Sequence, residues 1–376
     1  MLLKPQADAG GELSVRIEGQ ISMDTTRYDV VIVGGGAAGL SAATTLGRAL
    51  RSVLVIDSGT PRNAPAAGVH GYLSRDGMNP GELLSVGRSE VLSYGGTVID
   101  GEAVSARQIP DGFEVMLGDA RRFSGRRLLV TTGLTDELPP IDGLREHWGK
   151  GVVHCPYCHG WEIRGQQIGV LGTGPLSVHQ ALLFRQWSRD ITLFLNDTVQ
   201  PTEEERDKLA ARSVKVVDGA VACVDAVDGV LTGLTLHQGP SFDLQALAVG
   251  ARMEARSALL ESIGLSSQVH PSGAGRFIEA GDMGGATAVR GVYAAGNVSN
   301  LMAQMITAAA EGVMSGARIN ADLIEEETRW AVEGHFGPFS AASEAAVSKI
   351  VIGDRRHDLE DGQKAANTSP AATAKG

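Results

Sequence analysis

The strongest constraint on the fold is a short apolar strand that ends in three consecutive glycines and runs directly into an alanine-rich helix. Residues 28–33 form the strand pattern, Gly34-x-Gly36-x-x-Gly39 follows, and the next apolar run closes on Asp57. Such glycines permit a tight turn and let the backbone approach a pyrophosphate at the helix N-terminus. An acidic residue at the end of the next strand accepts hydrogen bonds from a ribose. The pattern predicts a βαβ unit that binds a dinucleotide.

A second strand–turn–helix unit lies downstream. Residues 167–171 read as a strand, Gly172-Thr-Gly174-Pro-Leu-Ser177 as the turn, and residues 191–195 as the returning strand. A third unit runs from residues 292–298 into a helix over 303–329. Near-continuous apolar strands suit parallel sheets that helices cover on both faces. The sequence therefore predicts an α/β protein with two Rossmann-like, doubly wound, three-layer nucleotide-binding domains.

Composition narrows the functional classes. The chain has 376 residues and a net charge of −11, which argues against nucleic-acid and anionic-membrane partners because both require a basic face. No apolar run is long enough to cross a bilayer, and residues 1–20 lack the apolar core of a secretory signal. Three cysteines cannot form a disulfide framework, so we expect a cytoplasmic protein. Residues 1–27 are expected to be a flexible leader and residues 337–376 a mobile tail.

The second chemical signal is the run Cys155-Pro-Tyr-Cys158-His159, which allows three interpretations. A zinc site needs a second ligand pair, and only Cys223 remains elsewhere. Covalent haem attachment uses the same spacing but accompanies export. The redox interpretation needs two thiols one helical turn apart at a helix start, where the thiol pKa is lowered. Since the run lies beside a βαβ unit, the sequence favours a redox pair and no metal site.

The order of these motifs resembles that of the low-molecular-weight thioredoxin reductases. The resemblance covers residues 28–330 and includes the strand end Thr131-Thr132-Gly133 and the late Gly296-Asn297. It implies an FAD-binding domain made of residues 28–145 and 271–330. The NAD(P)-type domain that carries the cysteines, residues 146–270, is then inserted into it. The family is usually homodimeric, which implies a homodimer here.

The resemblance also implies roles for individual residues. Cys158 would lie against the flavin, and Cys155 would exchange with the substrate. Asn297 replaces the aspartate that holds the ribityl chain in the family and is still able to form hydrogen bonds. The implied FAD-binding residues are Gly34, Gly36, Ala37, Ala38, Gly39, Asp57, Ser58, Thr132, Gly133, Gly296, Asn297, Gln304 and Met305.

Three departures from the reductases concern the reaction itself. His159 stands where they carry a proton-shuttling aspartate, and its imidazole is expected to act as a general acid or base. Ser177 takes the last small position of the second turn, whose possible nucleotide contacts are Gly172, Gly174 and Ser177. The clamp for the NADPH 2′-phosphate aligns with residues 195–197, where Asp197 would repel a phosphate.

These departures favour a dithiol oxidase over a reductase. The cysteine run and the second turn look more like the gliotoxin- and holomycin-type oxidases, which form a disulfide in a small-molecule dithiol and pass electrons to oxygen. The alternatives are an NAD(P)H-dependent reductase, acting on thioredoxin or a small disulfide, and a non-catalytic flavin redox sensor. The use of NAD(P)H, the substrate and a role for Cys223 stay open. The stretch Val69-His70-Gly71-Tyr72 is expected to face the flavin, the substrate pocket or the core.

Overall fold

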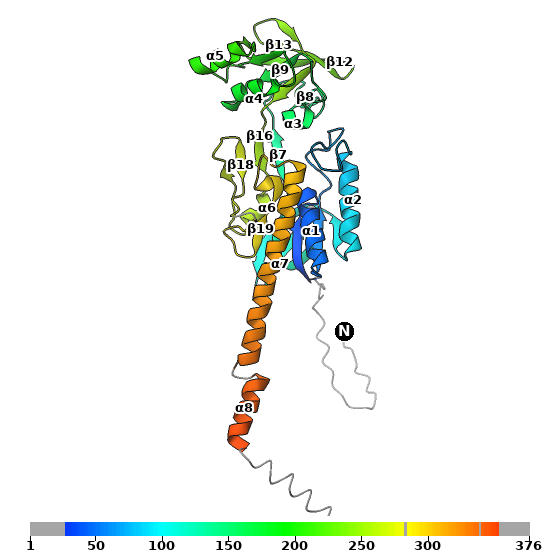
Figure 1. Ribbon diagram of the computed structural model, residues 1–376, viewed down its shortest axis with the longest axis vertical. Coiled ribbons are helices and arrows are strands. Elements are labelled where there is room, and N and C mark those ends of the chain that lie inside the picture. Colours follow the sequence, from blue (N-terminus) through cyan, green and yellow to red (C-terminus); the bar gives the residue numbers. More distant parts are fainter. Residues whose placement is uncertain (1–26, 282–283, 338–339, 353–376) are drawn as a thin grey trace, which may run out of the picture.

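The computed structural model describes residues 27–281, 284–337 and 340–352. Its first lobe is built on a seven-stranded sheet in the order β3-β2-β1-β6-β5-β4, with β19 paired to β6 (Figure 1). The strands are β1 (Arg27–Val33), β2 (Val53–Asp57), β3 (Thr97–Asp100), β4 (Ala103–Ile109), β5 (Gly112–Leu117), β6 (Arg122–Val130) and β19 (Val292–Ala294). Helices α1 (Ala37–Arg48), α2 (Pro80–Ser93) and α7 (Met305–Phe336) belong to the same lobe.

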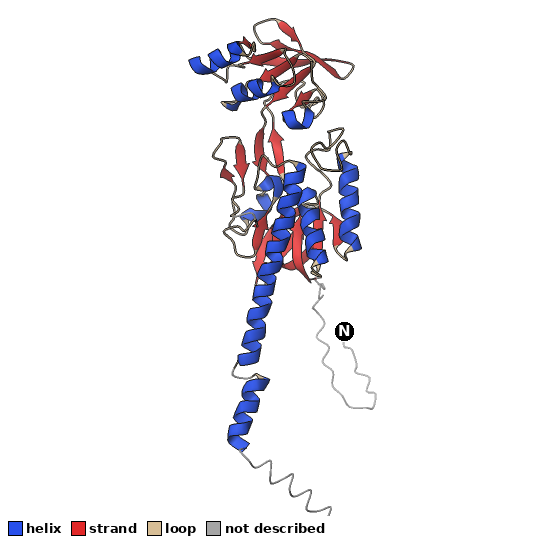
Figure 2. Cartoon of the chain, viewed as in Figure 1, coloured by secondary structure: helices blue, strands red, loops and turns tan. Residues whose placement is uncertain are grey.

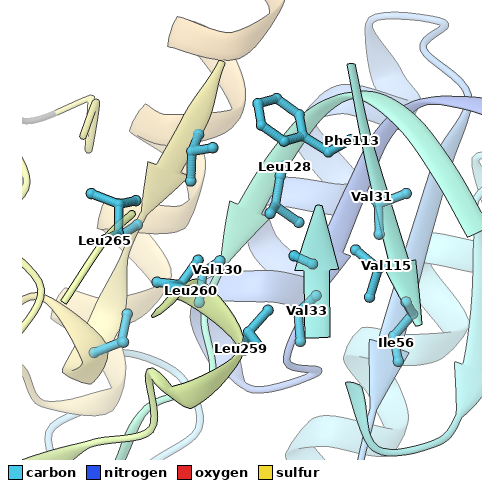
Figure 3. Packing of buried hydrophobic residues seen from close by; sticks show 14 of the residues in the cluster. Val31, Val33, Ile56, Phe113, Val115, Leu128, Val130, Leu259, Leu260 and Leu265 are labelled. Atoms are coloured by element: carbon cyan, nitrogen blue, oxygen red, sulfur yellow. The ribbon is translucent and has the colours of Figure 1, made fainter. Parts of the chain in front are cut away.

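The central strands of this sheet are buried on both faces, as the apolar pattern predicts. In β1, Val31 and Val33 pack in one core cluster, and Val30 and Ile32 pack in the cluster on the opposite face. Figure 3 shows the first of these clusters. Because successive side chains of a strand point to opposite faces, a strand covered on both sides must be apolar throughout.

The second lobe contains the second glycine turn and the cysteine run. Its five-stranded parallel sheet has the order β11-β10-β9-β15-β8, and a three-stranded sheet, β12-β13-β14, lies beside it. The strands are β8 (Val152–Val153), β9 (Ile168–Leu171), β10 (Ile191–Phe194), β11 (Lys215–Val217), β12 (Val221–Val227), β13 (Val230–Leu236), β14 (Ser241–Asp243) and β15 (Ala246–Val249). The helices are α3 (Pro156–His159), α4 (Leu176–Phe184) and α5 (Glu203–Ala211). In the sequence, the residues of this lobe lie between β6 and β19, two strands that pair in the first sheet. The predicted fold class, with one unit inserted into the other, is therefore confirmed.

Two strands lead between the lobes. β7 (Leu134–Glu137) and β16 (Arg252–Ala255) pair antiparallel in a small sheet with β17 (Gln268–Val269) and β18 (Gly275–Phe277). Helix α6 (Ala258–Glu261) follows β16 and packs on the first lobe through Leu259 and Leu260, whereas Leu144 packs in the second lobe. The chain thus passes between the lobes near residues 137 and 252, where the sequence placed the junctions near 146 and 270.

The C-terminal helices extend beyond the sequence expectation. Helix α7 continues to Phe336, past the predicted end at residue 329, and its lower part projects from the lobe (Figure 2). The segment expected to be a mobile tail contains helix α8 (Ala341–Ile352). The expected leader lies outside the described residues except for Arg27, which begins β1, and the tail lies outside them beyond residue 352. Within the described ranges, no helix combines the length and the hydropathy needed to cross a bilayer.

Ion pairs fasten the middle of α7 to the base of the first sheet. Arg126 of β6 pairs with Asp29 (3.0 Å), Glu326 (2.7 Å) and Glu327 (2.6 Å), and Arg51 pairs with Glu327 at 2.5 Å. Hydrogen bonds from Arg51 and Arg126 lower the pKa of Glu327 to about 2 from its usual 4.5. The charged carboxylate therefore stabilises the folded chain.

We expect acid to weaken this attachment. Because the pKa of Glu327 is lower in the folded chain, its contribution is complete above about pH 4.5 and is lost as the pH falls through about 2. Glu327→Gln should reduce the free energy of unfolding by about 1 kcal/mol or less at neutral pH, since the carboxylate is partly exposed. Urea titrations at neutral and acidic pH measure this difference, which should shrink in acid. Glu325→Gln, on the same helix, is the matched control and should change neither value.

Candidate flavin and dithiol site

One cavity of about 1000 Å³ lies between the two lobes and is lined by residues of both. Its lining joins the first glycine turn to the cysteine run, which lie more than a hundred residues apart in the sequence. Of the residues predicted to bind FAD, Gly39 alone does not line it. The lining ones are Gly34, Gly36, Ala37, Ala38, Asp57, Ser58, Thr132, Gly133, Gly296, Asn297, Gln304 and Met305.

The first glycine turn is tight on its protein side and open on its cavity side. A Cβ at Gly39 would lie 1.9 Å from the carbonyl oxygen of Gly34, and one at Gly34 would lie 2.3 Å from that of Thr131. A Cβ at Gly36, by contrast, would meet no atom of the described residues within 4 Å. No side chain of the described residues caps helix α1, so its N-terminus is left for a ligand. These features fit a pyrophosphate held at the helix start.

Asp57 lies at the end of β2, on the wall of the cavity. Arg88 of α2 forms an ion pair with its Oδ2, and the amide of Gly59 donates to its Oδ1 at 3.3 Å. The carboxylate is thereby fixed, and Oδ1 still has acceptor capacity for a ribose hydroxyl. The predicted role of Asp57 is compatible with this position.

The opposite end of the cradle is formed by the turn before α7. Gly296 has a φ of 74°, which favours glycine, and its amide donates to Glu311 at 2.8 Å. The Nδ2 of Asn297 donates to the carbonyls of Ala303 (2.9 Å) and Asn300 (3.1 Å). Its Oδ1 is therefore the atom left to accept a hydrogen bond, as an aspartate oxygen would be. The residues of the cavity fit FAD along its length.

The two cysteines reach this cavity from the second lobe, where Cys155 caps the short helix α3 and Cys158 lies one turn later. Both are free thiols in this structure. The hydrogen bond from Cys158, assisted by backbone amides and by Arg62, lowers the pKa of Cys155 to about 6 despite burial. The same hydrogen bond and burial raise the pKa of Cys158. In the reduced pair, Cys155 is therefore the thiolate and Cys158 the donor.

Two histidines flank the cysteines on the cavity wall. The Nδ1 of His159 is buried and has no hydrogen-bond partner among the described residues. Burial lowers the pKa of His159, so its imidazole is neutral at physiological pH and able to accept a proton. His154 donates from Nδ1 to the carbonyl of Val249 at 3.1 Å, and burial lowers its pKa as well.

The second glycine turn differs from the first because the side chain of Ser177 accepts hydrogen bonds from two of its backbone amides. The Oγ of Ser177, a residue only 3% exposed, accepts hydrogen bonds from the amides of Thr173 (3.0 Å) and Gly174 (3.3 Å). Pro175 follows and has no amide hydrogen to offer. The predicted nucleotide residues Gly172, Gly174 and Ser177 thus form one turn, but they do not line the cavity.

Several cavity residues have no signal in the sequence. Arg62, on the loop after β2, forms a bidentate ion pair with Asp136 of β7, and both line the cavity. Their contact joins residues that are distant in the chain, and the loop has no motif. Trp148 also lines the cavity without a sequence signal. Val69 and His70, from the stretch expected to face the flavin, the substrate pocket or the core, line it as well. Cys223 lies on β12 and donates to Asp225 at 3.6 Å, away from this wall.

Comparison with known proteins defines the class. Residues 28–312 match the family of pyridine nucleotide-disulphide oxidoreductases, and the chain belongs to this family. It is an FAD-dependent oxidoreductase of the thioredoxin reductase-like type, as the motif order indicated. NAD(P)H is the usual reductant in the family.

The relatives support this assignment at good coverage. The crystal structure of HlmI is 42% identical, with a TM-score of 0.76 over 82% of this chain and 96% of that one. An oxidoreductase from Agrobacterium tumefaciens is 34% identical, with a TM-score of 0.75 over 80% and 99%. Thioredoxin reductase tcpT from Claviceps purpurea (strain 20.1) is 31% identical over 317 residues, which cover 79% of this chain and 95% of the relative.

The contrast between the two turns predicts the effect of adding a side chain to each. Gly36→Val should leave the fold intact, because Gly36 has an ordinary extended backbone and open space, but its side chain should displace FAD. Gly174→Val is the matched control, since a Cβ there also meets no atom within 4 Å, and it should retain FAD. Flavin absorbance per mole of purified protein measures both. Equal flavin content in the two variants would contradict the assignment of the first turn.

Proposed function

We propose that this flavoprotein is a dithiol oxidase, which forms a disulfide in a small-molecule substrate and uses oxygen as the electron acceptor. The observation that carries the proposal is the closed second glycine turn. A pyrophosphate at that turn would have to displace the Ser177 hydroxyl from two amides, and Pro175 would offer it no donor. Asp197, with no cation beside it in residues 195–197, disfavours a 2′-phosphate. Tight use of NADPH is therefore disfavoured.

The cysteine chemistry suits oxidation of a dithiol. A substrate thiolate attacks the Sγ of Cys155 in the enzyme disulfide, and the S–S bond breaks with its electron pair passing to the Sγ of Cys158. The second substrate thiolate then attacks the substrate sulfur of this mixed disulfide and releases Cys155 as a thiolate. A low pKa makes Cys155 a good leaving group. The substrate has lost two electrons, and the enzyme pair has gained them.

The proton balance assigns a task to His159. The neutral imidazole accepts a proton from an incoming substrate thiol, since its Nδ1 has no hydrogen-bond partner in the described part of the chain. It returns protons as the cysteine pair is reoxidised, and hydrogen peroxide carries them away. When bound, FAD supplies a two-electron acceptor that oxygen can reoxidise. The sum is one dithiol and one oxygen molecule converted to one disulfide and one hydrogen peroxide.

The second candidate is an NAD(P)H-dependent disulfide reductase. Several relatives favour it, since those from Claviceps purpurea and Bacillus subtilis are thioredoxin reductases. In that case the electrons run in the opposite direction through the same cysteines, toward thioredoxin or a small disulfide. The homodimer and the cytoplasmic location inferred from the sequence stay predictions under both proposals.

Anaerobic titration of the purified flavoprotein separates the two directions. We expect a small dithiol such as dithiothreitol to bleach the flavin within the mixing time of a manual assay and NADPH or NADH to leave it oxidised. Readmitted air should restore the yellow colour and produce hydrogen peroxide. Cys158→Ser should keep FAD but resist bleaching by the dithiol. Rapid bleaching by NADPH at micromolar concentration would contradict the oxidase, and failure of every dithiol and disulfide to turn over would favour a sensor.

His159→Gln should lower kcat/KM for a dithiol by roughly 10²-fold near neutral pH, where the substrate thiols are mostly protonated. Because burial keeps the pKa of His159 below 6.5, the wild-type rate should fall only in acid, as the imidazole becomes protonated. In the variant the rate should instead rise with pH as the thiols ionise without a base, so the difference should shrink in alkali. A pH profile with a constant deficit would show that His159 is not the base. His147→Gln, a buried histidine that does not line the cavity, is the control.

A further inference from the structure

A partly buried ion pair, Arg62 with Asp136, lines the same cavity as the cysteines. The Nε of Arg62 lies 2.7 Å from Oδ2 of Asp136, and Nη2 lies 2.6 Å from Oδ1. The Asp136 side chain is only 7% exposed and that of Arg62 is 27% exposed. A bidentate pair fixes the plane of the guanidinium. Arg62 belongs to the loop after β2, and Asp136 to the strand β7 that leads into the second lobe.

The cation of the pair shares a cavity with the sulfurs. Arg62, Asp136, Cys155 and Cys158 all line the same cavity. The positive charge of Arg62 favours the thiolate form of both cysteines by lowering the pKa of each, although other contacts are larger. Asp136 raises the pKa of His154 but is not among the groups that act on Cys158.

One guanidinium nitrogen of Arg62 is not bonded to Asp136. Asp136 occupies Nε and Nη2, and Nη1 has no hydrogen-bond partner among the described residues. Removing Asp136 would free the Arg62 side chain to move within the cavity. The carboxylate thus anchors the cation instead of merely neutralising it.

We propose that Arg62 is a positioning residue of the redox reaction, held by Asp136, whose charge stabilises the thiolate of whichever cysteine leaves. When a substrate thiolate bonds to the Sγ of Cys155, the electron pair of the broken S–S bond resides on Cys158. When the substrate disulfide forms, the pair resides on Cys155. A cation in the cavity that both sulfurs line stabilises both products, which a hydrogen bond between the two thiols does for only one at a time.

The proposal goes beyond the direction of the reaction. Disulfide exchange at this pair produces the same thiolates whether the electrons go to oxygen or arrive from a nicotinamide. It rests only on Cys155 and Cys158 being the exchanging pair. Thiolate reactivity is measured without turnover, so its outcome is separate from that of the anaerobic titration.

The test is the pH dependence of alkylation of the reduced flavoprotein by iodoacetamide, with Cys155 quantified by peptide mass mapping. Arg62→Gln should shift the midpoint upward by about half a pH unit and slow alkylation about threefold below the wild-type midpoint. Arg62→Lys, which keeps the charge, should restore most of the rate. Arg107→Gln removes a cation that pairs with Glu114 at the sheet edge, and it is the control with no expected shift.

Arg62→Gln leaves the buried Asp136 without its cation, which destabilises the folded state of that variant. The double variant Arg62→Gln/Asp136→Asn removes both charges and should show the same upward shift. Circular dichroism and flavin content establish which variants are folded. An unchanged midpoint in the folded single or double variant, or a shift in Arg62→Lys as large as that in Arg62→Gln, would overturn the proposal.

Discussion

Close backbone contact at the first glycine turn holds the first lobe together. Gly39 lies against the carbonyl of Gly34, and the hydroxyl of Thr131 donates to that carbonyl at 2.8 Å. From the C-terminal segment, Gly312 of α7 approaches so closely that a Cβ would lie 2.0 Å from the carbonyl oxygen of Ala38. Three distant stretches of chain thus meet at one turn. The cradle for FAD exists because glycine lets their backbones touch.

The second lobe combines two opposite uses of polar groups. Near the cavity, polar atoms are left without partners or are poised to change partners, as the Nδ1 of His159 and the thiols of Cys155 and Cys158 are. At the second glycine turn the amides of Thr173 and Gly174 are satisfied internally. Unsatisfied buried groups cost free energy and are retained where chemistry uses them. This difference supports the cysteine face, rather than the turn, as the working part of the lobe.

Sequence alone predicted what local patterns encode. The strand–turn–helix pattern around Gly34–Gly39, with Asp57 after it, predicted the fold class. The spacing of Cys155 and Cys158 predicted the redox pair, and most of the residues predicted to bind FAD line the cavity. The Arg62–Asp136 pair was not predictable, because it depends on how a loop meets a strand from another part of the chain. The sequence could not show where the chain passes between the lobes for a related reason: Leu259 and Leu260 are apolar in either lobe, and only packing shows which one they join.

The serine-filled turn has a consequence for how the activity would be governed. A site that folds around its own hydroxyl gains little stability from an external ligand, so nucleotide concentration should not shift the population of folded protein. Under the proposed oxidase, the rate would then follow the supply of substrate and oxygen and stay independent of the ratio of reduced to oxidised nicotinamide in the cell. Such a protein would keep forming disulfides while the surrounding pools favour thiols.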